Sequence, residues 1–192
     1  MGRIARSLDV VPGTATTMVK SLSVSGLFDY EPRKGVRLTS AGKELAIHVL
    51  RRHRLIELFL VKTLGLDWSQ IHLEAERLEH AISDTVLDRI DQLLGHPVVD
   101  PHGDPIPTAN GSLDEGPATT LMDCAIDASV RIARIADQDP EFLQFVENSG
   151  LKPGVRLRVN QRNRAANAVT LTPHAKDALT LGQTAAEKIF VY

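Results

Sequence analysis

Residues 72–80 read HLEAERLEH, a stretch in which two histidines and three glutamates occupy nine positions. At about 100° of rotation per residue on a helix, four of these side chains fall within a sector about 100° wide: His72, Glu76, Glu79 and His80. Imidazole nitrogens and carboxylate oxygens are the usual protein ligands of manganese, iron and zinc. The spacing therefore predicts a helix that could present three of these four side chains to one divalent cation.

A second pair of ligand-type residues lies in the segment RRHRLIELFL (residues 51–60). His53 and Glu57 are four positions apart, which places them on the same face of a helix. A single His–Glu pair at this spacing is most often a solvated ion pair, so the pair alone does not indicate a metal. Only the two segments together favour a metal site. The HExxH signature of zinc proteases is absent.

The chain has 192 residues, of which 43% are hydrophobic, enough for one large or two modest folded domains. Its most apolar run, residues 45–66, is interrupted by five charged side chains and is not expected to cross a membrane. We expect no signal peptide, and the single cysteine, Cys124, excludes an internal disulfide. These features predict a cytoplasmic protein with no membrane partner.

Charge is segregated along the chain, although the formal net charge is only −2. Residues 1–62 hold 11 Lys+Arg and 5 Asp+Glu, residues 63–118 hold 2 and 11, and residues 119–192 hold 9 and 8. A basic segment suits phosphate groups and an acidic segment suits cations. The first two segments are therefore expected to bind different partners.

The first 44 residues predict a winged helix-turn-helix, or alternatively a helical hairpin followed by a basic loop. IARSLDV is expected to form a short helix that VPG breaks, and TATTMVKSLSVSG a second helix with Thr14 as N-cap and Gly26 just past its end. FDYEP and VRLT are expected to form a hairpin around RKG. In a winged helix the second helix enters the major groove and the hairpin tip faces phosphate. The DNA-binding residues predicted by position are Thr14, Thr16, Thr17, Lys20, Arg33 and Lys34.

Two long helices are predicted next, at residues 45–65 and about 69–94, with Trp68 between them as a packing anchor. The apolar side chains of the first helix are too numerous for this chain to cover, which predicts a face that packs against a second copy in a two-fold dimer. The side chains of this face are Leu45, Val49, Ile56, Phe59 and Leu60. Residues 95–117 contain five prolines and four glycines and are expected to form a linker that the prolines make stiffer than a random coil.

The C-terminal region is predicted to be β-rich. VRIARI, VRLRV, AVTLT and KIFVY are four expected strands, and DPEFLQFVENSG is a helix with Asp139 as N-cap and Gly150 as terminator. A small barrel of five short strands and one helix is expected, of which the pattern identifies these four strands. The predicted fold is thus α+β and mostly helical, in four parts: a winged helix at 1–44, a helical metal-binding and dimerisation domain at 45–107, a linker at 108–117 and a barrel at 118–192.

The runs RRHRLIELFLVKTLGL, IHLEAERLEHAISD and HPVVDPHGDPIP follow a winged helix in that order. This arrangement resembles the diphtheria toxin repressor family of iron- and manganese-dependent transcriptional repressors. The resemblance covers essentially the whole chain, and the last part is similar to the family's SH3-like (FeoA-like) barrel. It implies a homodimeric repressor of iron or manganese homeostasis that binds palindromic double-stranded DNA, catalyses no reaction and takes no small organic substrate.

The resemblance also implies two sites per subunit for Mn²⁺ or Fe²⁺. One falls by motif on His53, Glu57 and His72, and the candidates to complete it are Gln138 and Glu141. A second, regulatory site would use Glu76, Glu79 and His80, with side chains from a helix that precedes the DNA-binding motif. Iron-type members carry a cysteine where Glu76 stands, and a carboxylate favours Mn²⁺ or Fe²⁺ over softer ions. Manganese is therefore the preferred prediction.

Two features depart from the family pattern. Family members begin with a further helix that supplies ligands to the regulatory site, whereas this chain opens at MGRIARSL, within the next helix. Either the true start lies upstream or this product is truncated, and only a truncated product would lack a ligand at that site. The turn Val11-Pro12-Gly13 also differs from the order in better-known members, so base contacts do not transfer. Two alternatives stay open: a divalent-metal-dependent hydrolase whose ions activate water, and a truncated metal-binding dimer that does not bind DNA.

Overall fold

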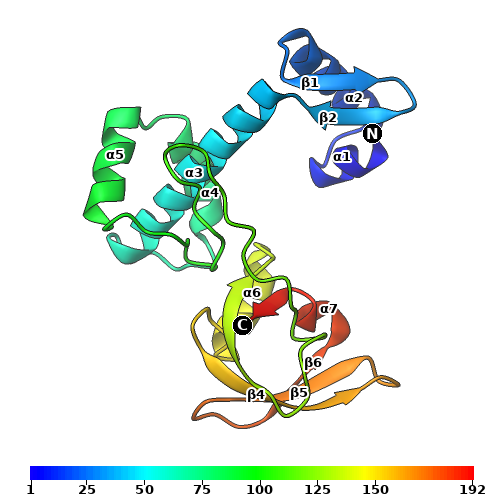
Figure 1. Ribbon diagram of the computed structural model, residues 1–192, viewed down its shortest axis with the longest axis vertical. Helices are drawn as coiled ribbons and strands as arrows, with labels where there is room; N and C mark the ends of the chain where they lie inside the picture. The colour runs from blue at the N-terminus through cyan, green and yellow to red at the C-terminus, as the bar shows by residue number, and fades with distance from the viewer. The chain divides into compact units, whose positions relative to one another are not determined.

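The structure is a computed structural model that describes all 192 residues. The chain forms two compact units, Met1–Leu50 and Arg51–Tyr192. Figure 1 follows it from the blue N-terminal helices and hairpin, through the long helix α3, to the yellow-to-red C-terminal sheet. None of the helices combines the length and the apolar character that crossing a membrane requires.

The first unit is a winged helix, as predicted. Its elements are α1 (Gly2–Ser7), α2 (Pro12–Val24), β1 (Phe28–Glu31) and β2 (Gly35–Leu38), followed by the start of α3 (Ser40–Lys62). The two strands pair antiparallel with Phe28 opposite Leu38. Ala5, Ala15 and Val19 are its buried apolar side chains, and Gly26 ends α2 with a φ of 76°, a conformation that glycine adopts without strain.

The predicted start of α2 was wrong. Val11 is the N-cap and Pro12 lies in the first turn, so Thr14 sits inside the helix rather than capping it. Proline suits this position because its fixed φ is already helical and the missing N–H would have no partner there. The VPG sequence therefore begins the second helix instead of breaking the first.

The helical part of the second unit contains the remainder of α3 with α4 (Ile71–Glu79) and α5 (Asp84–Leu93). The prediction of one helix over residues 69–94 was wrong, because His80 ends α4 and Ser83 begins the next helix. The Val86 N–H donates to the Ser83 hydroxyl at 3.4 Å, the usual role of serine at an N-cap. The break separates His80 from the helix that carries His72.

Part of the predicted dimer face is buried within the chain itself. Ile56 and Leu60 are 0% and 3% exposed and pack within the chain's own helical core. Leu45 and Val49 stay 47% and 36% exposed. Helix α3 also begins at Ser40, so it runs through the boundary that the sequence predicted between residues 44 and 45.

The C-terminal part is a five-stranded antiparallel sheet in the order β6-β5-β4-β3-β7. The strands are β3 (Ser129–Ile135), β4 (Arg156–Asn163), β5 (Ala168–Pro173), β6 (Leu179–Gly182) and β7 (Ile189–Val191), with helices α6 (Pro140–Asn148) and α7 (Gln183–Ala186). Asp139 caps α6 as predicted, its carboxylate accepting the Phe142 N–H at 2.9 Å. The sequence analysis named four of these strands and missed β6, which has four residues, and the one-turn helix α7.

Residues 99–105 form a packed turn that joins the helices to the sheet. One oxygen of the Asp100 carboxylate accepts the N–H groups of His102 and Asp104 at 2.8 and 2.9 Å. The His102 carbonyl accepts the N–H of Ile135 in β3 at 2.9 Å. Gly103 has a φ of +86°, and a Cβ atom there would lie 2.0 Å from the Ala133 carbonyl oxygen. Only glycine therefore lets this turn lie against β3.

Replacing Gly103 tests this close approach. We expect Gly154→Ala, which has a φ of +90° but open space around its Cβ, to cost about 1–2 kcal/mol for the left-handed backbone alone. Gly103→Ala should cost at least about twice as much, because the turn must also move away from β3. Urea unfolding of both variants measures the difference. Equal losses would show that the contact with Ala133 does not constrain the turn.

Candidate metal centre and DNA-binding surface

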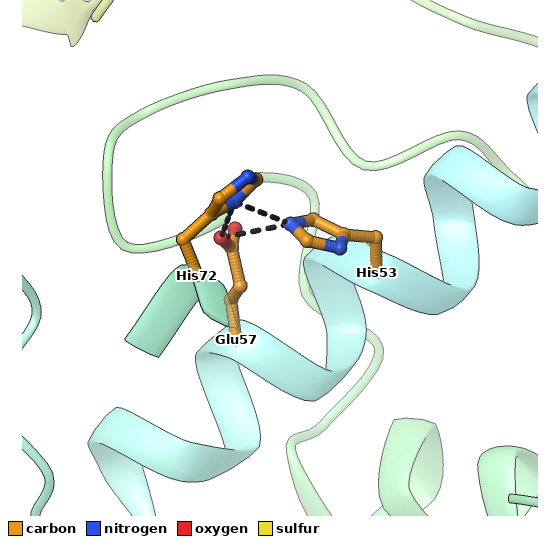
Figure 2. A group of neighbouring side chains, drawn as sticks. All are labelled: His53, Glu57 and His72. Carbon is orange, nitrogen blue, oxygen red and sulfur yellow. Dashed lines mark hydrogen bonds and ion pairs between the residues drawn. The ribbon is translucent and has the colours of Figure 1, made fainter. Parts of the chain in front are cut away.

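Three ligand-type side chains from two helices meet at one point. His53 and Glu57 lie one turn apart on α3, and His72 projects toward them from the first turn of α4 (Figure 2). The Nε2 atom of His53 lies 2.9 Å from Glu57 Oε1 and 3.0 Å from His72 Nδ1. The last two atoms are 3.3 Å apart. The structure thus brings together the three residues predicted for the first site.

The spacing and burial of this group fit a divalent cation. Metal–ligand bonds of about 2.1 Å place neighbouring ligand atoms of an octahedral ion about 3.0 Å apart, close to the three separations seen here. Glu57 is 0% exposed and its Oε2 atom has no hydrogen-bond partner. An ionised carboxylate buried in this way is costly unless a positive group compensates it. Two imidazoles and one carboxylate suit manganese, iron or zinc.

The other nitrogen of His53 binds a second carboxylate. His53 Nδ1 lies 2.8 Å from Glu79 Oε2, at the end of α4. A carboxylate on one imidazole nitrogen fixes the ring orientation and the tautomer, and leaves the other nitrogen to a metal. Glu79, which was predicted as a ligand of a second site, therefore adjoins the first group through His53.

The carboxylates and imidazoles shift one another's pKa values. Burial lowers the pKa of His53, but hydrogen bonds and negative charges from Glu57 and then Glu79 outweigh it, so that the pKa is raised overall. Burial raises the pKa of Glu57, and the hydrogen bond and positive charge of His53 outweigh it, so that this pKa is lowered. These shifts favour a proton on His53 and a negative charge on Glu57, and a cation would compete with that proton.

The other predicted ligands lie outside this group. Glu76 Oε1 is 3.6 Å from His72 Nε2, and His80 Nε2 is 3.4 Å from Glu79 Oε1, with the His80 side chain 79% exposed. Gln138 is half-buried before α6, and Glu141 is exposed in the first turn of that helix. A role for Glu76, His80, Gln138 or Glu141 in metal binding stays a prediction.

A buried polar cluster beside the centre was missed by the sequence analysis. The Arg54 guanidinium lies 3.6 Å from Asp100 Oδ2 and 3.4 Å from Asp104 Oδ1, and Arg134 of β3 lies 3.1 Å from the same Asp104 oxygen. Burial and the negative charges of Asp104 and Glu57 raise the pKa of Asp100 to about 8. In the sequence, only the two closely spaced aspartates of the DPHGD motif could have indicated this cluster.

The predicted DNA-binding side chains lie on the first unit. Thr14, Thr17 and Lys20 are exposed on α2, whereas Thr16 is half-buried. The hydroxyls of Thr16 and Thr17 donate to the carbonyls of Pro12 and Gly13 one turn earlier. Arg33 and Lys34 are exposed at the hairpin tip, where Lys34 pairs with Glu31 at 2.6 Å. Exposed surface ion pairs are weak, so this lysine remains able to meet a phosphate.

Three family models match successive parts of the chain. "Iron dependent repressor, N-terminal DNA binding domain" matches residues 1–36, and "Iron dependent repressor, metal binding and dimerisation domain" matches residues 39–108. The FeoA domain matches residues 119–192. The centre formed by His53, Glu57 and His72 lies within the second match.

The relatives agree with these matches. The iron-dependent repressor IdeR of Mycobacterium tuberculosis is 40% identical over 185 residues, covering 90% of this chain and 80% of the relative. The diphtheria toxin repressor of Corynebacterium diphtheriae is 30% identical over 186 residues, covering 91% and 80%. A solved manganese-dependent transcriptional repressor in complex with manganese superimposes with a TM-score of 0.90 at 39% identity, covering 98% of this chain and 87% of that one. The chain belongs to the diphtheria toxin repressor family of iron- and manganese-dependent transcriptional repressors.

Metal affinity is expected to depend on pH. Because Glu57 and Glu79 raise the pKa of His53, a proton competes with the cation for Nε2, and binding should tighten as the pH rises from about 6 to about 8. Calorimetric titration with Mn²⁺ in buffers of different ionisation enthalpy would measure the affinity and the protons released. An affinity that is flat across this range, with no proton release, would contradict the assignment of His53.

Asp100 is expected to make stability depend on pH. An acid whose pKa is raised to about 8 in the folded state keeps a proton that the unfolded chain loses near its ordinary pKa of about 4. This contribution to stability is complete below about pH 4 and disappears as the pH rises through about 8. Relative to Asp100→Asn, the wild type should lose more than about 1 kcal/mol between pH 5 and pH 8 in urea unfolding. A constant difference between the two proteins would contradict the raised pKa.

Proposed function

We propose that this protein represses transcription in response to manganese or ferrous iron, with His53, Glu57 and His72 as the ligands of the cation that it senses. The convergence of these three side chains from α3 and α4, within 3.3 Å of one another, is the observation that carries the proposal. The family consists of DNA-binding transcriptional repressors, which favours repression over the hydrolase alternative.

The ligand set supports a preference for manganese or ferrous iron. Carboxylate oxygens and imidazoles suit these ions, and no cysteine thiolate lies in the helices that carry the group, since the only cysteine is Cys124. The similar solved structure was described in complex with manganese. A second cation would draw on Glu76, Glu79 and His80. Glu79 would then exchange its hydrogen bond to His53 for the second cation, so that the two sites would influence each other.

The centre would act by joining α3 to α4. Without a cation, the negative charge of Glu57 would be balanced by the hydrogen bond and positive charge of His53, and this contact would weaken as the pH rises. A bound cation would supply a positive charge that does not depend on pH and would hold both helices at once. Occupancy would therefore favour one arrangement of the helical domain over others.

DNA binding would use the exposed face of α2 and the hairpin tip. Thr14, Thr17 and Lys20 would enter the major groove, and Arg33 and Lys34 would bind phosphates on either side of it. Two copies joined through the dimerisation domain would read a palindrome whose half-sites lie about one helical turn apart. Moving such a dimer from mostly unbound to mostly bound requires about 5.5 kcal/mol of preferential cation binding.

The test compares two histidine variants. His72→Ala removes one of three ligands and should lower Mn²⁺ affinity by about 100-fold or more, and with it the Mn²⁺-dependent shift of palindromic DNA. His96→Ala is the matched control, because His96 also pairs with a carboxylate, Asp91, at 2.8 Å but is 71% exposed and lies outside the centre. The control should respond to Mn²⁺ like the wild type.

Fluorescence anisotropy with labelled DNA, titrated with Mn²⁺ or Fe²⁺, measures DNA binding and the metal concentration that it requires. DNA binding by the wild type that ignores both metals would reject the proposal. Loss of response in both variants would also reject it, because the effect would then not be specific to the centre.

A further inference from the structure

Basic side chains form a row across the outer face of the C-terminal sheet. Arg131 of β3 lies directly opposite Arg156 of β4, and His174 continues the row, since its N–H donates to the Arg156 carbonyl at 2.9 Å. The backbones of neighbouring strands are about 4.8 Å apart. All three side chains are exposed, because the adjacent residues Val130 and Leu157 take the positions that point into the core.

A second row, beside the first, adds another arginine and polar groups. Ser129, Arg158 and Thr172 lie opposite one another on β3, β4 and β5. The Asn160 Nδ2 atom donates to Thr172 Oγ1 at 2.8 Å, which leaves the hydroxyl hydrogen of Thr172 for another acceptor. The two rows together therefore present guanidinium and hydroxyl donors on one surface.

The positive charge of this face is not neutralised by the chain itself. Arg131 and Arg156 form no ion pair, although like charges directly opposite each other on a sheet are destabilising. Arg158 pairs with Asp127 at 3.0 Å, but the two side chains are 64% and 69% exposed, and exposed pairs of this kind are weak. Solubility requires surface charge but not like charges in register, so the arrangement favours an anion that lies over the arginines.

The surface is hollowed where the two rows meet the turn after β5. The hollow has a volume of about 600 Å³, and Arg156, Arg158 and Thr172 line it together with Lys176. Asp127 is the only carboxylate among the lining residues, and none of them is Phe, Tyr or Trp. A concave site of this size suits a small molecule. Without an aromatic platform for a base, the ligand would be recognised through its charge.

We propose that this hollow binds a small anion with two or more linked phosphate groups. Arg156 and Arg158 would bind the phosphate oxygens in the bidentate manner that a planar guanidinium permits. The Thr172 hydroxyl would donate to a further oxygen, and Arg131 would add positive charge at the end of the row. The site shares no residue with the metal centre, and the proposal does not depend on the proposed function.

Pyrophosphate binding to the metal-free 192-residue protein tests the proposal. We expect calorimetry at fixed ionic strength to give a dissociation constant below about 1 mM, and Arg156→Gln to weaken binding about tenfold or more. Arg164→Gln is the matched control, because Arg164 is an equally exposed arginine of the same β4–β5 hairpin that does not line the hollow. It should bind pyrophosphate within about twofold of the wild type.

A change at Asp127 should act in the opposite direction. Asp127→Asn removes the carboxylate that repels the anion and holds Arg158, so pyrophosphate should bind about threefold more tightly. Asparagine tolerates the φ of 61° at this position, so the fold should be kept. Thermal unfolding without ligand would verify that each variant is folded.

Several results would overturn the proposal. They are the absence of pyrophosphate binding below about 1 mM, equal losses in Arg156→Gln and Arg164→Gln, and sulfate binding as tight as that of pyrophosphate. Tripolyphosphate and ATP distinguish a free polyphosphate from a nucleotide and should bind with similar affinity, whereas binding of ATP alone would contradict recognition through phosphate. If Arg156→Gln weakened binding to non-specific duplex DNA but not to pyrophosphate, the face would be a surface for nucleic acid and the proposal would be wrong.

Discussion

A buried carboxylate is the constraint on which the rest of this molecule depends. Glu57 is 0% exposed on a helix whose neighbouring positions, Leu55, Ile56 and Leu58, form the helical core. A negative charge in such a place requires a positive partner, and the available partners are a proton on His53 or a divalent cation. Proton and metal would therefore compete for one site under the proposed function, which would connect the packing of α3 against α4 to the supply of metal.

The same constraint explains the polar surroundings of the centre. Glu79 orients His53 through its other nitrogen, and Arg54 brings positive charge close to Asp100 and Asp104. The DPHGD turn then contacts β3 through His102 and Gly103. Helix α3, which carries His53 and Glu57, begins at Ser40 and so contributes to both compact units of the chain. His53 and Glu57 therefore lie on a helix that belongs to both units.

Much of this arrangement could be predicted from the sequence, because local spacing carries it. The placement of His53 and Glu57 on one face of a helix and the role of Asp139 as the N-cap of α6 each depend on a few neighbouring residues. Both predictions are confirmed. Long-range contacts could not be predicted in the same way. Ile56 and Leu60 were assigned to a dimer face because the helices that bury them are distant in sequence. The contact of Glu79 with His53 joins two different helices, and the contact of His102 with Ile135 joins the turn to β3, so neither could be predicted from local spacing.

Anomalous diffraction from crystals grown with Mn²⁺ would test the central claim most directly. The account predicts a manganese peak within bonding distance of His53 Nε2, Glu57 Oε1 and His72 Nδ1, with Glu79 still bound to His53 Nδ1 unless a second peak has recruited it. Fully occupied manganese elsewhere in the molecule, with these three atoms still bonded only to one another, would contradict it.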